Sequence, residues 1–429
     1  MTKHTKIFAN ETEYKNYISS AAYQTPVISV MNDKRYMGYD NRKEEIIATT
    51  TSNSRLITIA QQKGWIPSTQ TYLTKHECEA VTSIDLSNSN IQMFDEFRYF
   101  TRITTIEENA FEYSDLISIT LPNTITEIKF DAFYSCYNLK NIILPNSLKI
   151  IGVSAFEDCQ SLQSIIIPNN VTTIGASAFY NCGLTHIEIP ETVKQLNNCF
   201  VGCEHLTSVK LHEGLEILTN TFNSCLNLLS IDIPSTVKML GNTTFYQCRK
   251  LSKITFNGNA LSVIGSNCFS GCWNLHELKI PESVVEIGSR AFYDSPIKSI
   301  NIPHNVTTLS DYLFWGDAEL TTLEIPEGVT TIGNYTFSHV GEQWPGNDFY
   351  AHNPLRLTIP RNVTNIGSYC FSGLISELKF ETVSAPTITA ATFSDLNLNF
   401  TKILIKRGTH SLYRNAAYWS NIISYIQVY

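Results

Sequence analysis

Charged side chains are scarce in this sequence. Asp, Glu, Lys and Arg make up only 16% of the 429 residues, the formal net charge is −8, and residues of both signs are scattered along the chain. A protein whose main partner is nucleic acid or an anionic membrane gathers Lys and Arg on one surface. The composition therefore argues against both kinds of partner.

Long apolar runs are also missing. No stretch approaches the roughly 18 consecutive apolar residues that predict a membrane-spanning helix. The start of the chain, Met1–Phe8, is basic, but no apolar stretch follows it. We therefore predict neither a membrane span nor a secretory signal in this chain.

Common catalytic signatures are absent as well, since the sequence contains no Gly-rich phosphate loop, no HExxH and no GxSxG. His186 lies close to Glu188 and His276 precedes Glu277, but no Ser or Cys stands at a spacing that suggests a catalytic triad. The sequence predicts a protein that is not an enzyme and that carries no cofactor.

What the sequence does have is a repeat marked by phenylalanine. The residue recurs at positions 111, 133, 156, 179, 200, 222, 245, 269, 292, 314, 337, 371 and 393. Eleven of the twelve intervals are 21 to 24 residues, a period typical of leucine-rich repeats, in which each repeat is one strand-bearing coil. We predict a mainly β solenoid in which each coil packs on its neighbours.

The interior of one repeat predicts its strand. Ile165–Ile167 alternates with period two and ends at Pro168, which suits a short strand whose first and last side chains point inward. Equivalent triplets in the other repeats are expected to stack into one long parallel sheet, with short helical or irregular segments on the convex side. Glycines such as Gly175 mark a second bend in each coil.

The chain divides into three predicted parts. Residues 1–72 lack the repeat and are interpreted as a small N-terminal lobe of unknown role, with β-like runs at 27–31 and 34–39 and a helix that begins at Asn53 or Ser54. Residues 73–408 form the solenoid, including its N-terminal cap, and residues 409–429 form a C-terminal cap.

The predicted N-terminal cap begins with a helix. Thr74 and Glu77 form a capping box for a helix that runs to about Val81. Ile84 and Leu86 are then predicted to form the first strand of the stack.

The repeat is interrupted once, between positions 337 and 371, where the interval is 34 residues. The inserted segment, 338–352, holds Trp344, Phe349, Tyr350 and His352. Large amphipathic side chains on an exposed loop are common anchors of a recognition site, so these four residues are predicted to bind a partner. The alternative is that Trp344 and Phe349 fold back and cover the edge of a coil.

The eleven cysteines follow the same repeat. Seven stand three residues after the repeat phenylalanine, at positions 136, 159, 182, 203, 225, 248 and 272. One inward position repeated in successive coils predicts a packed column of free thiols, because free Cys is among the most buried residue types. The pairs Cys199/Cys203 and Cys268/Cys272 have a spacing within the zinc range but lack a second ligand pair, so we predict no metal.

The repeat resembles a known family. Ala155–Gly175 fits the pattern Ala-Phe-x-x-Cys-x-x-Leu-x-x-Ile-x-Ile-Pro-x-x-Val-x-x-Ile-Gly at nearly every position, and this pattern resembles the BspA-type leucine-rich repeat of bacterial surface proteins, common in Bacteroidetes. The resemblance covers about residues 80–429. It implies a cell-surface or secreted protein that binds or adheres to a protein or glycan.

The outward position of each predicted strand forms a column of its own. Glu188, Lys210 and Asp232 follow one another in it and are expected to pair across neighbouring strands and to contribute to binding. The alternative is a solvated face without a partner.

Two functions therefore stay open at this point. The first is a non-enzymatic, monomeric binding or adhesion protein that presents its solenoid surface to a protein or glycan. The second is a structural or receptor-binding component of a phage-like or secretion particle, attached through the N-terminal lobe.

Overall fold

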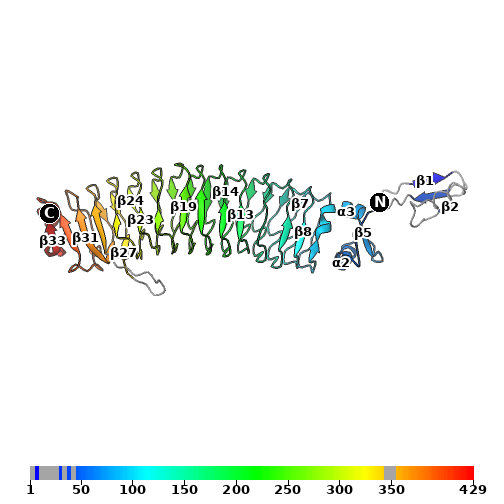
Figure 1. Ribbon diagram of the computed structural model, residues 1–429, viewed down its shortest axis with the longest axis horizontal. Coiled ribbons are helices and arrows are strands. Elements are labelled where there is room, and N and C mark those ends of the chain that lie inside the picture. The colour runs from blue at the N-terminus through cyan, green and yellow to red at the C-terminus, as the bar shows by residue number, and fades with distance from the viewer. Residues whose placement is uncertain (1–4, 9–28, 31–35, 40–44, 343–353) are drawn as a thin grey trace.

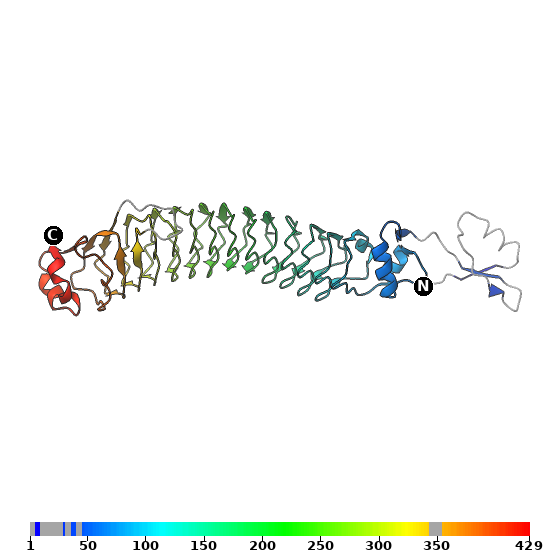
Figure 2. The same ribbon diagram turned by 90° about the horizontal axis from the view of Figure 1, so that it is seen from below.

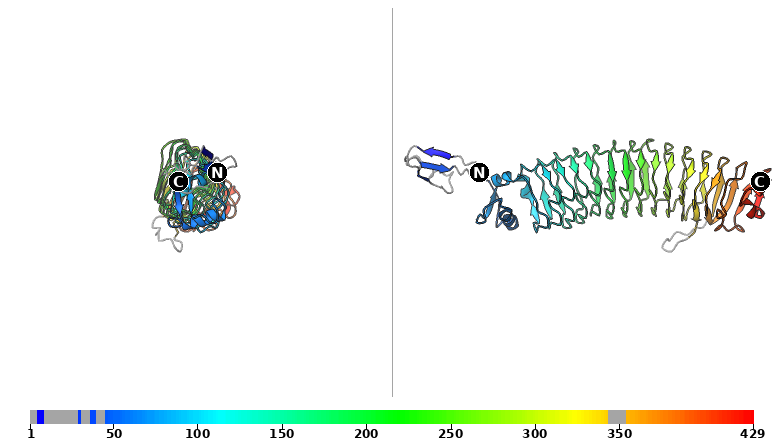
Figure 3. Two further views of the ribbon diagram at one scale, coloured as in Figure 1. Left: turned by 90° about the vertical axis from the view of Figure 1, so that its right-hand side faces the viewer. Right: turned by 180° about the vertical axis from the view of Figure 1, so that it is seen from behind.

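The solenoid is the dominant feature of the computed structural model, which describes residues 5–8, 29–30, 36–39, 45–342 and 354–429. Successive turns of chain lie side by side along one long axis (Figure 1). Seen along that axis, the coils superimpose (Figure 3). The predicted repeat solenoid with parallel strand pairing is confirmed.

One row of strands follows one long side of the solenoid. Its members are β6 (Met93–Phe94), β8 (Ser118–Thr120), β10 (Asn141–Ile143), β13 (His186–Glu188), β15 (Ser208–Lys210), β17 (Ser230–Ile233), β19 (Lys253–Phe256), β21 (Glu277–Leu278), β23 (Ser299–Ile300), β25 (Thr322–Leu323), β28 (Leu355–Ile359), β31 (Ile375–Phe380), β32 (Lys402–Ile405) and β33 (Ile426–Val428). The row is divided into four parallel sheets, so the prediction of one continuous sheet is wrong.

A second row of parallel strands runs along another side of the coils. It consists of β7 (Thr105–Ile106), β9 (Glu127–Ile128), β11 (Ile150–Ile151), β12 (Thr173–Ile174), β14 (Gln195–Asn197), β16 (Ile217–Thr219), β18 (Met239–Leu240), β20 (Val263–Ile264), β22 (Glu286–Ile287), β24 (Thr308–Leu309), β26 (Thr331–Ile332) and β29 (Asn365–Ile366). We predicted only a bend here. The sequence signal was the buried Ile or Leu in front of each bend. This residue is the inward-pointing member of a strand of two or three residues.

The segment Ile165–Ile167 is not a strand, contrary to the prediction. Its side chains alternate as expected, with Ile165 and Ile167 buried and Ile166 87% exposed. Alternation requires only extended backbone, whereas a strand also requires hydrogen bonds to neighbouring coils. The bonds of this coil form on its other side, where the Thr172 amide donates to Lys149 at 2.9 Å.

The repeat phenylalanines form the centre of the core. Their rings stack from Phe111 to Phe393, with neighbouring centroids 4.9 to 6.2 Å apart, and almost all are fully buried. Phe337 and Phe371 are direct neighbours in this column, with ring planes 1° apart. Phe337 and Phe371, which flank the inserted segment 338–352 (the excursion) in the sequence, therefore belong to adjacent coils of the column.

The N-terminal end of the stack is covered by two helices (Figure 2). In α2 (Ser54–Gln62), the Asn53 side chain accepts a hydrogen bond from Leu56 N at 3.1 Å, which confirms the predicted helix start. The predicted capping box is also present in α3 (Lys75–Ala80), where Thr74 N donates to Glu77 Oε2 at 2.9 Å. β4 (Ile46–Thr49) and β5 (Tyr72–Thr74) pair antiparallel beside these helices.

The first coil starts later than predicted. Residues 81–86 form no strand, and the first parallel strand of the row is β6, which is followed by the 3-10 helix η1 (Asp95–Tyr99). Ile84 and Leu86 are buried, but in this segment only Leu86 N reaches the next coil, at 2.6 Å from Ala110 O. The next bond to that coil, from Asn88 N to Glu112 O at 2.7 Å, lies beyond the predicted strand.

The C-terminal end is closed by α4 (His410–Asn415), the 3-10 helices η2 (Trp419–Asn421) and η3 (Ile423–Tyr425), and β33. Tyr413 and Trp419 are fully buried, and the Trp419 ring lies 5.4 Å from Phe393, the last ring of the column. These two side chains cover apolar surface that would otherwise face water.

Near the start of the chain, β1 (Thr5–Phe8), β3 (Tyr36–Tyr39) and β2 (Ser29–Val30) form a small antiparallel sheet in that order. The division into 1–72, 73–408 and 409–429 stays a prediction, and the pairing of β4 with β5 crosses its first boundary. Within the described ranges, no helix has the length and apolar character needed to cross a membrane.

Candidate functional site

The charged pair predicted on the sheet face forms. Glu188 of β13 lies opposite Lys210 of β15, and Lys210 Nζ is 2.7 Å from Glu188 Oε1. His212 Nε2 lies 2.7 Å from the same oxygen. Hydrogen bonds from Lys210 and then from His212 hold the pKa of Glu188 below its ordinary value. Both partners are more than half exposed, so the pair contributes little to stability.

Asp232 does not join this row, contrary to the prediction. It lies opposite Thr255 of β19, and it forms no ion pair with any residue that the structure describes. β15 and β17 are paired only between Ser208 and Ser230, and the Lys210 ammonium group is directed at Glu188 in the coil before. The row therefore ends at Lys210.

The other predicted binding residues, Trp344, Phe349, Tyr350 and His352, lie outside the described residues. The described chain reaches the excursion through β27 (Phe337–Val340), which pairs in parallel with β30 (Phe371–Gly373). It resumes just before β28.

A stack of tyrosines, not predicted from the sequence, joins the three coils that precede and follow this interval. Tyr312 and Tyr335 have ring centroids 4.6 Å apart and planes 7° apart, and for Tyr335 and Tyr369 the values are 5.0 Å and 13°. One coil earlier, the guanidinium carbon of Arg290 lies 4.5 Å from the centroid of Tyr312. We call Arg290, Tyr312, Tyr335 and Tyr369 the edge stack. Its tyrosines are half-buried and its arginine is exposed.

The edge stack occupies a strained backbone position. Each of its residues stands two before a column phenylalanine, and this position has φ between 49° and 59° in every coil from Asn109 to Tyr369. The earlier coils fill it with Asn109, Asp131, Ser154, Ser177, Asn198, Asn220, Thr243 and Asn267. Asn and Asp tolerate this left-handed conformation, whereas for a bulky side chain it is an outlier that costs on the order of 1–3 kcal/mol.

Stacking offsets part of that strain, since an aromatic pair contributes about 0.5–1.5 kcal/mol beyond its buried area. The earlier coils fold without rings at this position, so stacking is not needed to hold the backbone in this conformation. The change from Asn, Asp, Ser and Thr to Arg and Tyr after Asn267 was the sequence signal that could have revealed the stack.

Hydrogen-bonding groups run alongside the edge stack. Asp311 Oδ1 accepts from the Asn334 amide at 2.7 Å, and Asn334 Oδ1 accepts in turn from the Ser368 amide at 2.8 Å. Ser368 Oγ lies 2.9 Å from Thr389 Oγ1. A row of carboxylate, amide and hydroxyl groups therefore follows the tyrosines coil by coil.

A second aromatic group lies on the other flank of the phenylalanine column. Tyr293 and Trp315 each follow a column phenylalanine, and their rings are 4.4 Å apart and 5° from parallel. The His339 ring meets Trp315 edge-on at 5.2 Å. His339 belongs to β27, so this aromatic group includes the last strand that is described before residue 343.

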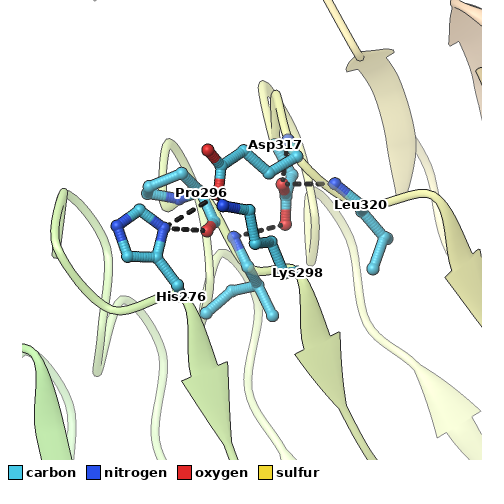
Figure 4. Close-up of polar contacts among 7 residues, drawn as sticks. His276, Pro296, Lys298, Asp317 and Leu320 are labelled. Carbon is cyan, nitrogen blue, oxygen red and sulfur yellow. Dashed lines mark hydrogen bonds and ion pairs between the residues drawn. The ribbon is translucent and has the colours of Figure 1, made fainter. Parts of the chain in front are cut away.

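A polar cluster surrounds the turn Ser295–Ile297 (Figure 4). This turn is one residue shorter than the equivalent turns 272–275 and 317–320. His276 reaches across it, with Nδ1 3.1 Å from Pro296 O and 2.8 Å from Glu319 Oε2. Lys298 Nζ lies 3.4 Å from the same Glu319 oxygen.

Asp317 stands in this cluster at the position that cysteine occupies in earlier coils. It is fully buried, and its carboxylate accepts hydrogen bonds from the amides of Ile297, Glu319 and Leu320 at 3.3, 3.0 and 3.1 Å. Burial raises its pKa well above the ordinary value. Its bonds satisfy backbone donors around the short turn, so the cluster serves the fold and offers no exposed acid for chemistry.

The predicted thiol column is present. All eleven cysteines are free and buried, and each of the seven repeat thiols donates to the carbonyl of the phenylalanine one coil earlier, at 2.9 to 3.3 Å. Burial raises their pKa, in Cys136 to about 11. A protonated, buried thiol is a poor nucleophile. Within the described ranges, no three His, Cys, Asp or Glu side chains lie together as a metal site.

The two histidines considered from the sequence have local polar contacts. His186 Nδ1 lies 3.1 Å from the hydroxyl of its neighbour Thr185, and His276 Nδ1 lies 3.1 Å from Pro296 O and 2.8 Å from Glu319 Oε2. Nothing in the geometry of the described residues shows catalysis.

Similar solved structures are bacterial leucine-rich-repeat proteins. A leucine-rich repeat protein from Bacteroides ovatus is 24% identical with a TM-score of 0.57, covering 76% of this chain and 88% of that one. A leucine rich cell surface protein from Faecalibacterium prausnitzii is 25% identical with a TM-score of 0.39, covering 68% and 83%. The pneumococcal vaccine antigen PcpA is 17% identical with a TM-score of 0.46, covering 81% and 86%. The first of these supports the fold alone.

Among curated proteins, no relative matches this chain. The family described as BspA type leucine rich repeat region (6 copies) matches residues 88–207, 126–251, 184–283, 238–342 and 344–428. Together these matches run from β6 to β33, with only residue 343 left between the last two. The chain therefore belongs to the BspA type leucine rich repeat family.

Proposed function

We propose that this chain is a non-enzymatic binding or adhesion protein that holds a protein or glycan on the surface of its solenoid. The observation that carries the proposal is the edge stack: Tyr312, Tyr335 and Tyr369 are accessible aromatic residues in a backbone conformation that disfavours them. Strained residues that a fold retains cluster where ligands are held. Action at a cell surface or outside the cell is part of the proposal and is supported by membership of the family.

The solenoid suits such a role because its stability is local. Each coil is fixed by stacked phenylalanines and by backbone bonds to its neighbours, so the outward side chains are free to vary without loss of the fold. Tyrosine provides a large contact area at a low cost in conformational entropy. The edge stack is therefore our first candidate for the contact surface.

Two further contact regions belong to the proposal. The first is the sheet face with Glu188, Lys210 and Asp232, and the second is the excursion with Trp344, Phe349, Tyr350 and His352. The described part of this segment includes His339 of β27, whose ring contacts Trp315.

The test is a binding screen of the purified chain against immobilised extracellular-matrix proteins and a glycan array. We expect saturable binding that the variant Tyr335→Ala weakens, with Tyr180→Ala as the matched control because Tyr180 is an exposed tyrosine outside the edge stack. Binding to neither class of probe would contradict the proposed function. Binding that both variants retain in full would mean that another surface makes the contact.

A further inference from the structure

The edge stack ends abruptly at Tyr369. One face of its ring lies on Tyr335, and its amide donates to Ala391 O in the next coil at 3.0 Å. Ala391 stands two residues before Phe393, where the three previous coils carry tyrosine. Within the described residues, no further ring stacks on Tyr369. Ala391 also lacks the positive φ of the three tyrosine positions, so the row of stacked rings stops at Tyr369, with one ring face that is not stacked on another described ring.

The surroundings of this open ring face are polar and small. Ser368 and Thr389 hold their hydroxyl groups 2.9 Å apart beside it, and Thr389 and Ala390 are exposed. A protein anchor is normally held in a well-packed, desolvated pocket lined by apolar groups. Ser368, Thr389 and Ala390, which border Tyr369 in its own coil and the next, supply no such apolar lining.

A sugar ring matches this arrangement. One face of a pyranose carries C–H groups that pack on the negative face of an aromatic ring, and its rim carries hydroxyl groups that need donors and acceptors. Tyr369 supplies the ring face, while the hydroxyl groups of Ser368 and Thr389 supply the hydrogen-bonding partners. The faces of the other tyrosine rings are stacked on one another, so these rings present only their edges, with one phenol group per coil. Their ring centroids are 4.6 and 5.0 Å apart from coil to coil.

We propose that the open face of Tyr369 is a subsite for one sugar of an oligosaccharide, whose following sugars lie along the phenol edges of Tyr335 and Tyr312 toward Arg290. This proposal rests on the proposed function and narrows its partner to a glycan. Arg290 at the far end is exposed, and a guanidinium group pairs readily with a carboxylate. A glycan with uronic acid units gains this contact in addition to the stacking.

Affinity gel electrophoresis with soluble polysaccharides tests the subsite. Xyloglucan, mannan, polygalacturonate and hyaluronan are cast in separate native gels, and we expect at least one to retard the chain. Tyr369→Ala should weaken that retardation about tenfold or more, because it removes a central aromatic anchor. Tyr369→Phe should retain it, because the ring face remains.

Ser368→Ala provides a second variant, since it removes one of the two hydroxyl groups and leaves the ring of Tyr369 in place. It should weaken retardation less than Tyr369→Ala does, while leaving the melting temperature close to that of the natural chain. Arg290→Gln should weaken retardation by the two acidic polysaccharides and leave that by the two neutral ones unchanged. Tyr180→Ala is the control that should change nothing.

The outcomes separate this inference from the proposed function. If none of the four polysaccharides retards the chain while a matrix protein binds it, the glycan subsite is wrong and the binding function stands. If the Tyr369→Ala and Ser368→Ala variants bind a polysaccharide as well as the natural chain does, the ligand class is right and the location is wrong. If polysaccharides and proteins all fail to bind, both proposals fall.

Discussion

Removing one ring from the phenylalanine column should damage the solenoid locally. Phe245 is fully buried between Phe222 and Phe269, with ring centroids 5.7 and 5.5 Å away. The variant Phe245→Ala deletes the whole ring and both stacking contacts. Phe to Ala substitutions in cores cost about 3–5 kcal/mol through lost burial and the remaining cavity.

The cost should lie in the upper part of that range, because the coils cannot close the gap. Phe245 N donates to Cys268 O at 2.8 Å, and Phe222 N donates to Thr244 O at 2.9 Å, so backbone bonds fix the spacing of the coils. If the loss is about 4 kcal/mol and confined to the neighbouring coils, amide protection there should fall by about three orders of magnitude.

Hydrogen exchange followed by mass spectrometry measures this effect peptide by peptide. Peptides around Phe222, Phe245 and Phe269 should lose protection, whereas peptides around Phe111 and Phe371 should keep theirs. Tyr246→Ala is the matched control, because Tyr246 is in the same coil and is only half-buried. A uniform loss of protection along the chain would refute the argument that each coil depends on its neighbours alone.

Three further predictions concern charge and thiols. Burial and then the nearby Glu157, Glu112 and Glu108 raise the pKa of Asp131 to about 6. Because the carboxyl pKa is raised in the folded state, the ionised Asp131 destabilises the fold as pH rises from about 4 through 6. In denaturant titrations, Asp131→Asn should therefore raise the free energy of unfolding by about 1 kcal/mol at pH 7.5, after allowance for solvent screening, and by almost nothing at pH 3.5. An equal gain at both pH values would contradict this. Lys210→Ala should leave the melting temperature unchanged within error, since its ion pair with Glu188 is exposed, and a drop of several degrees would show that the pair matters. Iodoacetamide should modify none of the eleven cysteines in the folded chain and all of them in denaturant, and an intact mass short of eleven adducts would indicate disulfides.

The phenylalanine repeat was sufficient to predict the architecture because a solenoid brings residues one period apart into contact. Phe245, Cys248 and their equivalents recur at the same position in coil after coil, so a single pattern describes a whole column of the core. The capping box at Thr74 and the pairing of Glu188 with Lys210 were also predictable, since both depend on residues at a fixed local or one-period spacing.

Other features depend on how the coils lie against one another. The sequence could not reveal that Ile165–Ile167 lacks a hydrogen-bonded ladder, because its alternation is the same as in true strands. It could not reveal that His276 reaches Glu319, 43 residues away, because that contact exists only where the turn between them is one residue short.

The sequence by itself therefore determined the fold, the buried columns and the family, because these follow from a period that every coil repeats. Only the tertiary structure decided where the surface departs from the period. The edge stack depends on the backbone conformation two residues before Phe314, Phe337 and Phe371, which sets three tyrosine rings parallel within 4.6 to 5.0 Å of each other. Stacking of these rings across coils depends on the distance between ring centroids and the angle between ring planes, and the spacing of the residues along the chain gives neither.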